Sequence, residues 1–554
     1  MNSNLNKLFL LLFAAVLVLF SACEKEEVFE KTRLFRPVLN QELYSELNTI
    51  IVNMGNSRDA VSYTLEVSRD TFQNLDYTIE TDTNYVVINE ELLNGDPLLW
   101  NTLYQVRVTA HASDPAYDSK VSDLGNVRTQ RFPSILQIPA DNDVIDVAAR
   151  VKWTIAGAAV TKIKSFTPSD LKLTSPLSEY IVDNAGQAAG EFIVTGLTPA
   201  TTYQLAIYSA GPNGDLLRGW ETYTTLAAGV DLTDPNVINL TENDDPDAVI
   251  TAVATANDGA IIALKKGVQY NLPVENLDKS ITIRGAYGFG DQKAILFTTG
   301  NWNIAEGANI DHVRFIDVEL RGEDIGGDYV FNPNVGAYTV LNELTFENCI
   351  ISYFRGIMRI RGDMFVTNYN ILNSIVHHIG GYGVMTTDTD GDNKAAVDNI
   401  LFQNTTISKV NTFFQTRQNV QSFVIDACTV NEVATTGGRV LRFRGGDGKN
   451  DVVNGMSITN TIWGHGWDEG ESGNFDVRLV AEGMVNTSFT VVNTYATSDF
   501  STAGYEMPGF PALNYSGSAA DLWVDPYDGL DFNFKDNGFA GKYDAGDPRW
   551  RAKL

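Results

Sequence analysis

The chain has 554 residues, of which 44% are hydrophobic and 20% charged, a composition typical of folded domains rather than of disordered segments. One hydrophobic core does not usually serve so long a chain, so several domains are expected. The formal net charge of −29 argues against nucleic acid as a partner, because such binding rests on a basic surface. Binding of an anionic ligand stays open, since local charge decides it.

Residues 1–22 are expected to form a signal peptide. Lys7 precedes the apolar run Leu8–Phe20, which is too short for a typical membrane span. The segment LFSAC that ends at Cys23 resembles the lipobox of bacterial lipoproteins, and by that resemblance Cys23 would carry lipid. The charged residues 24–27 resemble the surface-export signal of glycan-degrading Gram-negative bacteria. These resemblances imply a lipid-anchored protein of the outer membrane that faces the cell exterior. The alternative is an ordinary signal peptide with a chance cysteine.

Residues 23–35 are expected to form a charged tether, and two β-sandwich modules are expected at 36–132 and 133–227. Short strands of alternating hydrophobicity, separated by turn residues, fill this region, as is typical of antiparallel sandwiches. The segment Gly196–Tyr203 resembles the tyrosine corner of fibronectin type III modules, and Leu99–Tyr104 is a weaker copy. The modules are expected to act as spacers, with glycan binding as the alternative.

A repeated strand motif begins after residue 228. Each copy is a strand of alternating apolar residues that ends in Asn, or a substitute, followed by a small residue. The irregular spacing of the copies, 23 to 33 residues, suits a solenoid whose loops vary while its strands stack. Stacked polar side chains at these turns can form a hydrogen-bonded ladder. The turn positions are Asp317, Asn348, Asn373, Asn404, Ala427, Asn460 and Asn493.

These repeats resemble those of the pectin-lyase-like right-handed parallel β-helix superfamily. Gly259–Tyr270 and Ser280–Gly285 are similar to the first coil of such proteins. The ending Ala545–Trp550 resembles that of β-helix lipoproteins encoded with polysaccharide-uptake systems. The expected fold is therefore all-β, with two fibronectin type III-like modules followed by a parallel β-helix at 228–554 that has a C-terminal cap. Cys349 and Cys428 lie in apolar runs and are expected to be small buried side chains without a disulfide.

Two strands with the same pattern carry the functional prediction, Met358–Gly362 and Leu441–Gly445. Their apolar residues should point inward and their arginines outward, because side chains alternate along a strand. Stacked arginines in so acidic a chain favour an anionic ligand that lies along the axis, such as a uronate polysaccharide. The alternative is that they pair with carboxylates such as Asp363, Asp426 and Asp447. The two predicted outward columns are Arg361, Thr387, Arg417 and Arg444, and Arg359, Met385, Gln415 and Arg442.

Aromatic residues near the same coils are candidates for stacking on sugar rings, with plain packing as the alternative. They are Tyr382, Trp463 and Trp467, together with Tyr353 and Phe354. Asp388, Asp390 and Asp392 alternate around Gly391 and resemble the first part of a calcium loop, although Asn399 stands where an EF-hand would have its glutamate. Calcium is therefore a possible cofactor, and a plain acidic turn is the alternative.

Three kinds of enzyme were compared with these residues. A pectate-lyase type of elimination needs a base and a cationic group beside the uronate carboxylate, but the family's catalytic run is not found. Residues 464–466 (GHG) resemble a polygalacturonase motif, but the paired aspartates that hydrolysis needs are missing. The motifs of pectin methylesterases are also missing. The leading prediction is a non-catalytic surface protein that binds an acidic glycan, such as pectin or alginate, for outer-membrane uptake proteins. A β-helix polysaccharide lyase is the alternative, and a structural surface protein the third possibility.

Overall fold

The computed structural model describes residues 32–553 apart from 213, 436, 468–482 and 502–506. The predicted signal peptide, Cys23 and most of the tether lie outside the described residues. The chain folds as two compact units: the first combines the residues up to Ile138 with Val151–Phe192 and Thr202–Tyr223, and the second combines Pro139–Arg150, Ile193–Thr201 and the residues from Thr224 onward. Among the described residues, no helix has the length and apolarity that a membrane span requires.

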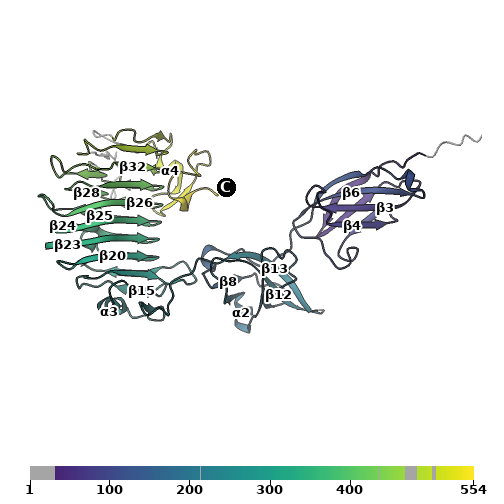
Figure 1. Ribbon diagram of the computed structural model, residues 1–554, viewed down its shortest axis with the longest axis horizontal. Helices are drawn as coiled ribbons and strands as arrows, with labels where there is room; N and C mark the ends of the chain where they lie inside the picture. The colour runs from purple at the N-terminus through teal and green to yellow at the C-terminus, as the bar shows by residue number, and fades with distance from the viewer. Residues whose placement is uncertain (1–31, 213, 436, 468–482, 502–506, 554) are drawn as a thin grey trace, which may run out of the picture. The chain divides into compact units, whose positions relative to one another are not determined.

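The N-terminal region is built from small β-sheets, as predicted (Figure 1). In the first module, core residues from both sheets, such as Val52 and Leu65, pack in one cluster, as in a sandwich. The Leu99 N–H donates to the Tyr104 hydroxyl at 2.9 Å, which is the contact expected of a tyrosine corner. The first module has the sheets β1 (Leu39–Glu46), β2 (Thr49–Met54), β5 (Tyr85–Ile88) and β4 (Tyr77–Thr81), β3 (Ala60–Ser68), β6 (Leu103–Ala112), β7 (Ser122–Arg128). The following region has β10 (Ser178–Ile181), β9 (Val160–Phe166), β12 (Thr202–Gly211), β13 (Gly214–Thr224) in one sheet, β11 (Glu191–Thr195) and β8 (Ala148–Lys152) in another, and helix α2 (Asn184–Ala189).

The C-terminal region is a parallel β-solenoid, as predicted (Figure 1). Its strands stack in three rows, named here A, B and C in chain order around each coil. Row A contains β14 (Val237–Leu240), β15 (Ala260–Leu264), β17 (Ile281–Gly285), β20 (Asn309–Ile316), β23 (Asn334–Glu347), the last part of β24 (Ile350–Leu372), β26 (Ala396–Gln403), β29 (Ser422–Asp426), β32 (Met456–Thr459) and β34 (Phe489–Val492). Row B contains β16 (Gln269–Asn271), β18 (Ala294–Thr298), β21 (Val318–Gly322), the starts of β24 and β25 (Ile375–Thr387), β27 (Thr406–Val410), β30 (Thr429–Val433), β33 (Ile462–Trp463), β35 (Tyr495–Ala496) and β36 (Leu513–Asn514). Row C contains β19 (Asn301–Trp302), β22 (Tyr329–Phe331), the middle of β24, the end of β25, β28 (Phe414–Thr416) and β31 (Leu441–Phe443).

Aligned apolar side chains fill the interior of the solenoid. Phe315 and Phe346, which pair in register on row A, stack with their ring centroids 5.2 Å apart. The short helix α3 (Ala248–Thr255) buries Val249 in the same core near the first coils. Near the C-terminus, helix α4 (Ala519–Leu522) and the strands β37 (Trp523–Asp525) and β38 (Asp531–Phe534) enclose a smaller core of their own.

The predicted turn ladder between rows A and B is confirmed. All seven predicted turn residues have φ between 51° and 56°, a left-handed conformation that Asn and Asp adopt more readily than most residues. The Asn348 amide donates to Asp317 at 3.0 Å, and the Asn493 amide donates to Asn460 at the same distance. Ala427 has no amide, and Asn460 donates instead to the neighbouring Asp426 at 2.9 Å.

Cys349 and Cys428 each follow a ladder residue and lie inside the solenoid as free thiols, as predicted. The Cys349 thiol donates to the Phe315 carbonyl at 3.3 Å, and burial raises the pKa of this thiol to about 12. Burial also raises the pKa of Cys428. Both thiols therefore act as small core side chains rather than as reactive groups.

The C-terminal segment 545–550 lies against row B and joins several coils. The Asp547 carboxylate is 2% exposed and accepts a hydrogen bond of 2.8 Å from the Thr406 hydroxyl. The Asp547 N–H donates to Thr429 on the next coil at 2.9 Å. Arg549 donates to the Asn373 carbonyl at 2.7 Å. Residues 545–550, whose sequence resembles the ending of glycan-uptake lipoproteins, thus join consecutive coils through hydrogen bonds.

Candidate functional site

Row C brings together the arginines that the sequence singled out. The strand register pairs Arg359 with Thr386, Thr386 with Gln415, and Gln415 with Arg442. Adjacent coils lie about 4.8 Å apart, so Arg359 and Arg442 stand roughly 14 Å apart along the axis. Two residues further along each strand, Arg361, Asp388, Arg417 and Arg444 succeed one another in the same way.

The predicted columns are wrong by one residue on β25. Met385 and Thr387 were expected to point outward, but both are fully buried. Met385 pairs with Met358 and Phe414 in an apolar stack inside the solenoid, and this stack fixes the register of the strand. By this register Thr386 pairs with Arg359, although Thr386 is itself fully buried, and Asp388 follows Arg361 in the second column.

The Asp388 carboxylate lies at the centre of the arginines. Arg359 donates to Asp388 Oδ2 at 2.5 Å, and Arg444 donates to Oδ1 at 2.9 Å. Arg417 Nε lies 3.5 Å from Oδ1, while its Nη1 donates to Asp390 at 2.5 Å. The alternative that the arginines pair with carboxylates therefore applies to three of them, although the carboxylate is Asp388 of the loop rather than Asp363, Asp426 or Asp447.

Positive charge remains in excess at the site. Arg361 contacts no carboxylate among the described residues, and donates instead to the Asn332 carbonyl and side chain at 3.1 and 3.0 Å. Burial lowers the pKa of Arg361, and the charge of Arg359 adds to this effect. Burial followed by the charge of a neighbouring arginine likewise lowers the pKa values of Arg442 and Arg444. A neighbouring guanidinium charge thus adds to the effect of burial at each of these three arginines.

Tyr382 is the predicted aromatic residue that the structure brings to these arginines. The Arg359 guanidinium lies 4.0 Å from the centre of its half-buried ring, and that of Arg355 lies 4.9 Å away. Such cation–π contacts hold the guanidinium planes and the ring in a fixed arrangement. We call Arg359, Arg361, Arg417, Arg442, Arg444, Asp388 and Tyr382 the arginine cluster.

Trp463 and Trp467 do not belong to the arginine cluster, and their burial favours the alternative of plain packing. Trp463 is 1% exposed, packs in the solenoid core and donates from its indole nitrogen to the Thr461 hydroxyl at 2.9 Å. Trp467 is also buried, with its ring edge toward His378. Large aromatic rings stabilise cores as often as they bind ligands, and the sequence did not separate the two uses.

The aspartates of the predicted calcium loop are engaged by basic side chains. Asp388 is held by arginines, Asp390 by Arg417, and Asp392 accepts a hydrogen bond of 2.7 Å from Lys449. In the part of the chain that the structure describes, no three His, Cys, Asp or Glu side chains are placed to hold a metal ion. The acidic loop instead supplies counter-ions to the neighbouring coils.

Sequence reasoning missed two residues of the site, Asn332 and Arg355. Neither belongs to a repeated motif, so the sequence carried no signal for Asn332. The position of Arg355 on the same strand as Arg359 and Arg361 was a signal that could have been used.

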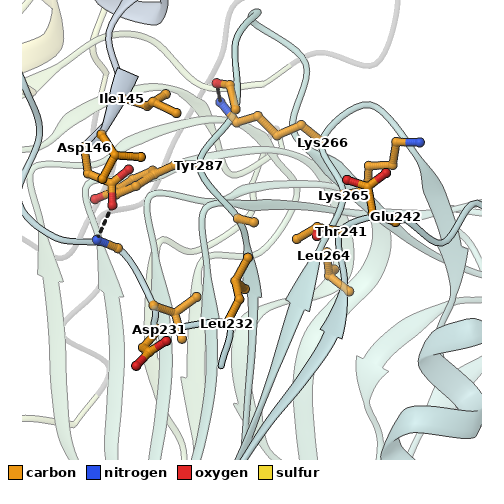
Figure 2. A pocket seen from close by; sticks show the side chains of 15 residues that line it. Ile145, Asp146, Asp231, Leu232, Thr241, Glu242, Leu264, Lys265, Lys266 and Tyr287 are labelled. Carbon is orange, nitrogen blue, oxygen red and sulfur yellow. Dashed lines mark hydrogen bonds between the residues drawn. The ribbon is translucent and has the colours of Figure 1, made fainter. Parts of the chain in front are cut away.

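A separate hollow lies beside the first coils (Figure 2). Lys265, Lys266, Asp231 and Glu242 are among the residues that line it, with the Tyr287 ring. Its charges have both signs, so it does not share the cationic character of the arginine cluster.

Two family models match the solenoid. One, described as "Domain of unknown function (DUF4957)", matches residues 269–410, and a second, "Domain of unknown function (DUF5123)", matches 423–550. The first range contains Arg359, Arg361, Tyr382 and Asp388, and the second contains Arg442 and Arg444, whereas Arg417 lies between the two ranges. No curated protein matches the chain. Among solved structures, the chain is similar to the FN1–FN3 domains of chicken CNTN1, with 15% identity, coverage of 35% of this chain and 68% of that one, and a TM-score of 0.15.

Proposed function

We propose that this protein is a lipid-anchored surface protein that binds an acidic, uronate-containing polysaccharide through the arginine cluster, without cleaving it. The observation that carries the proposal is the gathering of five arginines from three coils on row C, where Asp388 and Asp390 are the carboxylates that contact them among the described residues. A planar guanidinium offers two parallel donors to a carboxylate, which suits a uronate better than a neutral sugar.

The arrangement of the arginines along the stacking axis supports a polymer rather than a small anion as the ligand. The arginines succeed one another along the stacking axis at multiples of about 4.8 Å, a spacing comparable to one sugar unit of an extended chain. A polyanion lying along row C could thus present successive carboxylates to successive coils. Tyr382 supplies an aromatic face beside Arg359.

Asp388 acts in this proposal as an internal counter-ion. Its oxygens hold Arg359 and Arg444 in place before a ligand arrives, which lowers the entropy cost of ordering long side chains on binding. Its oxygens are already occupied by guanidinium groups, so it is poorly placed to take a proton from a substrate. This supports binding without catalysis over the lyase alternative.

The setting of the protein in this proposal comes from sequence resemblance. The lipobox at Cys23 would anchor the chain in the outer membrane, and the fibronectin-like modules would act as spacers. The resemblance of the solenoid to pectin-lyase-like β-helices, and of residues 545–550 to glycan-uptake lipoproteins, supports pectin or alginate as candidate ligands and outer-membrane uptake proteins as partners.

Affinity gel electrophoresis on polygalacturonate and alginate tests the proposal. The wild type should be retarded by at least one polymer, and replacement of Arg361, Arg417 and Arg444 by Ala should weaken association at least tenfold. The matched control replaces three ion-paired arginines outside row C, Arg69, Arg107 and Arg314, by Ala. Equal retardation of both triple variants would refute the site. Ultraviolet absorbance of the same mixtures with calcium should stay flat, since a rise from unsaturated ends would establish the lyase instead.

A further inference from the structure

Row B carries two columns of polar and aromatic side chains on the same coils. The register pairs Ser352 with His377, His377 with Ser408, and Ser408 with Asn431. The next residue of each strand forms the second column. We call these two columns the corner columns: Ser352, His377, Ser408 and Asn431 in one, and Tyr353, His378, Lys409 and Glu432 in the other.

The backbone turns both columns away from the core. Tyr353, His378, Lys409 and Glu432 have φ between 51° and 62°, a conformation that such residues rarely adopt. The flanking Ile351 and Phe354 are both fully buried, so the left-handed residue lets two adjacent side chains leave the interior together. The same unfavourable conformation recurs on four coils, and strained residues of this kind concentrate at functional sites.

At the C-terminal end of the corner columns, several polar atoms lack a hydrogen-bond partner among the described residues. Glu432 is 7% exposed, and its Oε2 accepts no hydrogen bond from the described residues. Asn431 is fully buried; its amide nitrogen donates to the Pro526 carbonyl at 3.3 Å, while its Oδ1 has no donor there either. The Ser408 hydroxyl is close enough to lower the pKa of Glu432, but no hydrogen bond of good geometry joins them. Buried acceptors without donors are costly, so these atoms suit a group that brings O–H donors.

At the N-terminal end of the corner columns, the aromatic residue Tyr353 is exposed to solvent. Tyr353 is 41% exposed, and its ring stacks on His378 with the centroids 4.8 Å apart and the planes 20° apart. His378 and Lys409 are half-buried, so exposure falls steadily from Tyr353 to Glu432. A ligand could rest on the Tyr353 ring and reach inward with its polar groups.

The corner columns differ from the arginine cluster in charge. Burial lowers the pKa of His377 to about 3, with His378 and Lys409 adding to the effect, and burial also lowers the pKa of His378. Burial raises the pKa of Glu432 to about 7. Near neutral pH the two imidazoles are uncharged and Glu432 is partly protonated, which makes the site a poor receptor for a polyanion.

We propose that the corner columns form a second saccharide subsite, which binds a short uncharged oligosaccharide. One sugar ring lies against Tyr353, and a further unit, three coils or roughly 14 Å along the axis, donates from its hydroxyl groups to Glu432 Oε2 and Asn431 Oδ1. The proposal does not require the arginine cluster to bind a ligand. Tyr353 and Arg359 are six residues apart on β24, roughly 20 Å for an extended strand. A glycan that carries both uronate and neutral residues could therefore engage both rows.

Matched polymers separate the two sites. Polygalacturonate, alginate and a glucuronan are compared by calorimetry with the same polymers after reduction of their carboxyl groups to alcohols. The wild-type full chain should bind at least one reduced polymer. Tyr353→Ala and the isosteric Glu432→Gln should each weaken that binding about fivefold or more, because they remove the ring and the acceptor oxygen. Tyr338→Ala, an exposed aromatic of row A, is the matched control and should bind as the wild type does.

Two outcomes would overturn the subsite. If the wild type binds none of the reduced polymers, the unpartnered oxygens hold water only. If both variants bind a reduced polymer as tightly as the wild type, the ligand sits elsewhere. Either result leaves the arginine cluster untouched, because that site is judged on unreduced polymers and on the arginine variants.

Discussion

Rows B and C belong to the same coils, yet their polar side chains differ in charge and in hydrogen bonding. On row C, Asp388 contacts three guanidinium groups, although Arg361 contacts no carboxylate among the described residues. On row B, Glu432 and Asn431 are buried more deeply but retain atoms without partners among the described residues. Paired charge at the surface indicates a site ordered in advance for an anion, whereas unpaired neutral acceptors indicate a site completed by a donor. The predictions that follow test this contrast.

The largest expected effect concerns the tryptophan that proved structural. Trp463→Ala should lower the free energy of unfolding by about 3–5 kcal/mol, because it empties a large volume in the solenoid core. Urea denaturation followed by circular dichroism measures this loss. Trp463→Phe should recover most of the stability and bind every polymer as the wild type does. A binding defect in the stable Phe variant would return Trp463 to the ligand site.

Glu432 should make stability depend on pH. Its pKa is raised from 4.5 to about 7 in the folded chain, so its contribution is complete below about pH 4.5 and is lost as pH rises to about 7. The loss should amount to at most about 3 kcal/mol. The carboxyl faces Ser408, Lys409 and Asp528, and the positive charge of Lys409 moderates the effect.

Denaturation of the wild type and Glu432→Gln between pH 4.5 and 7.5 isolates this contribution. Stability of the wild type relative to the variant should fall across this range. His377, His378 and Asp547 titrate in both proteins, so their contributions cancel in the difference. A difference that stays flat would show that Glu432 is not held in the buried state described here.

Asp388→Asn should destabilise the protein by about 2 kcal/mol, because it leaves the guanidinium groups of Arg359, Arg417 and Arg444 facing one another without a counter-charge. Asp390→Asn is the control and should cost less than about 0.5 kcal/mol, since this carboxylate is 76% exposed. Thermal denaturation compares the two. The Asp388→Asn variant should also bind acidic polymers more weakly, and tighter binding would mean that Asp388 competes with the ligand instead of ordering the site.

The sequence predicted the solenoid that carries these sites better than it predicted the side-chain contacts within them. All seven predicted turn positions of the ladder, from Asp317 to Asn493, adopt the same left-handed conformation, because each repeat carries its own turn signal. The arginines do share one row, but their columns were displaced by one residue at Thr387. That register is set by the buried stack of Met358, Met385 and Phe414, which links residues distant in sequence. The role of Asp388 follows from that register and was therefore missed.

The corner columns were also missed, for a different reason. Tyr353 was noticed as an aromatic residue, but Lys409 and Glu432 stand in strands that resemble other repeats. Only stacking in register shows that they continue the column of His378. A periodic pattern of apolar residues predicts which residues are inside a solenoid, whereas the outward columns depend on the exact length of each turn.

The smallest expected effect is a change of binding affinity with salt concentration, which distinguishes the proposed sites on rows B and C most directly. Binding of an acidic polymer to the arginine cluster should weaken roughly threefold when salt rises from about 50 to about 300 mM, because the site is close to the surface and its charges are screened. Binding of a carboxyl-reduced polymer to the corner columns should stay constant over the same range, since hydrogen bonds to Glu432 and Asn431 involve no net charge on the ligand. Calorimetry of both polymers at each salt concentration gives the comparison. Equal salt dependence would mean that one site binds both polymers. This result would contradict the proposal of separate ligand sites on rows B and C.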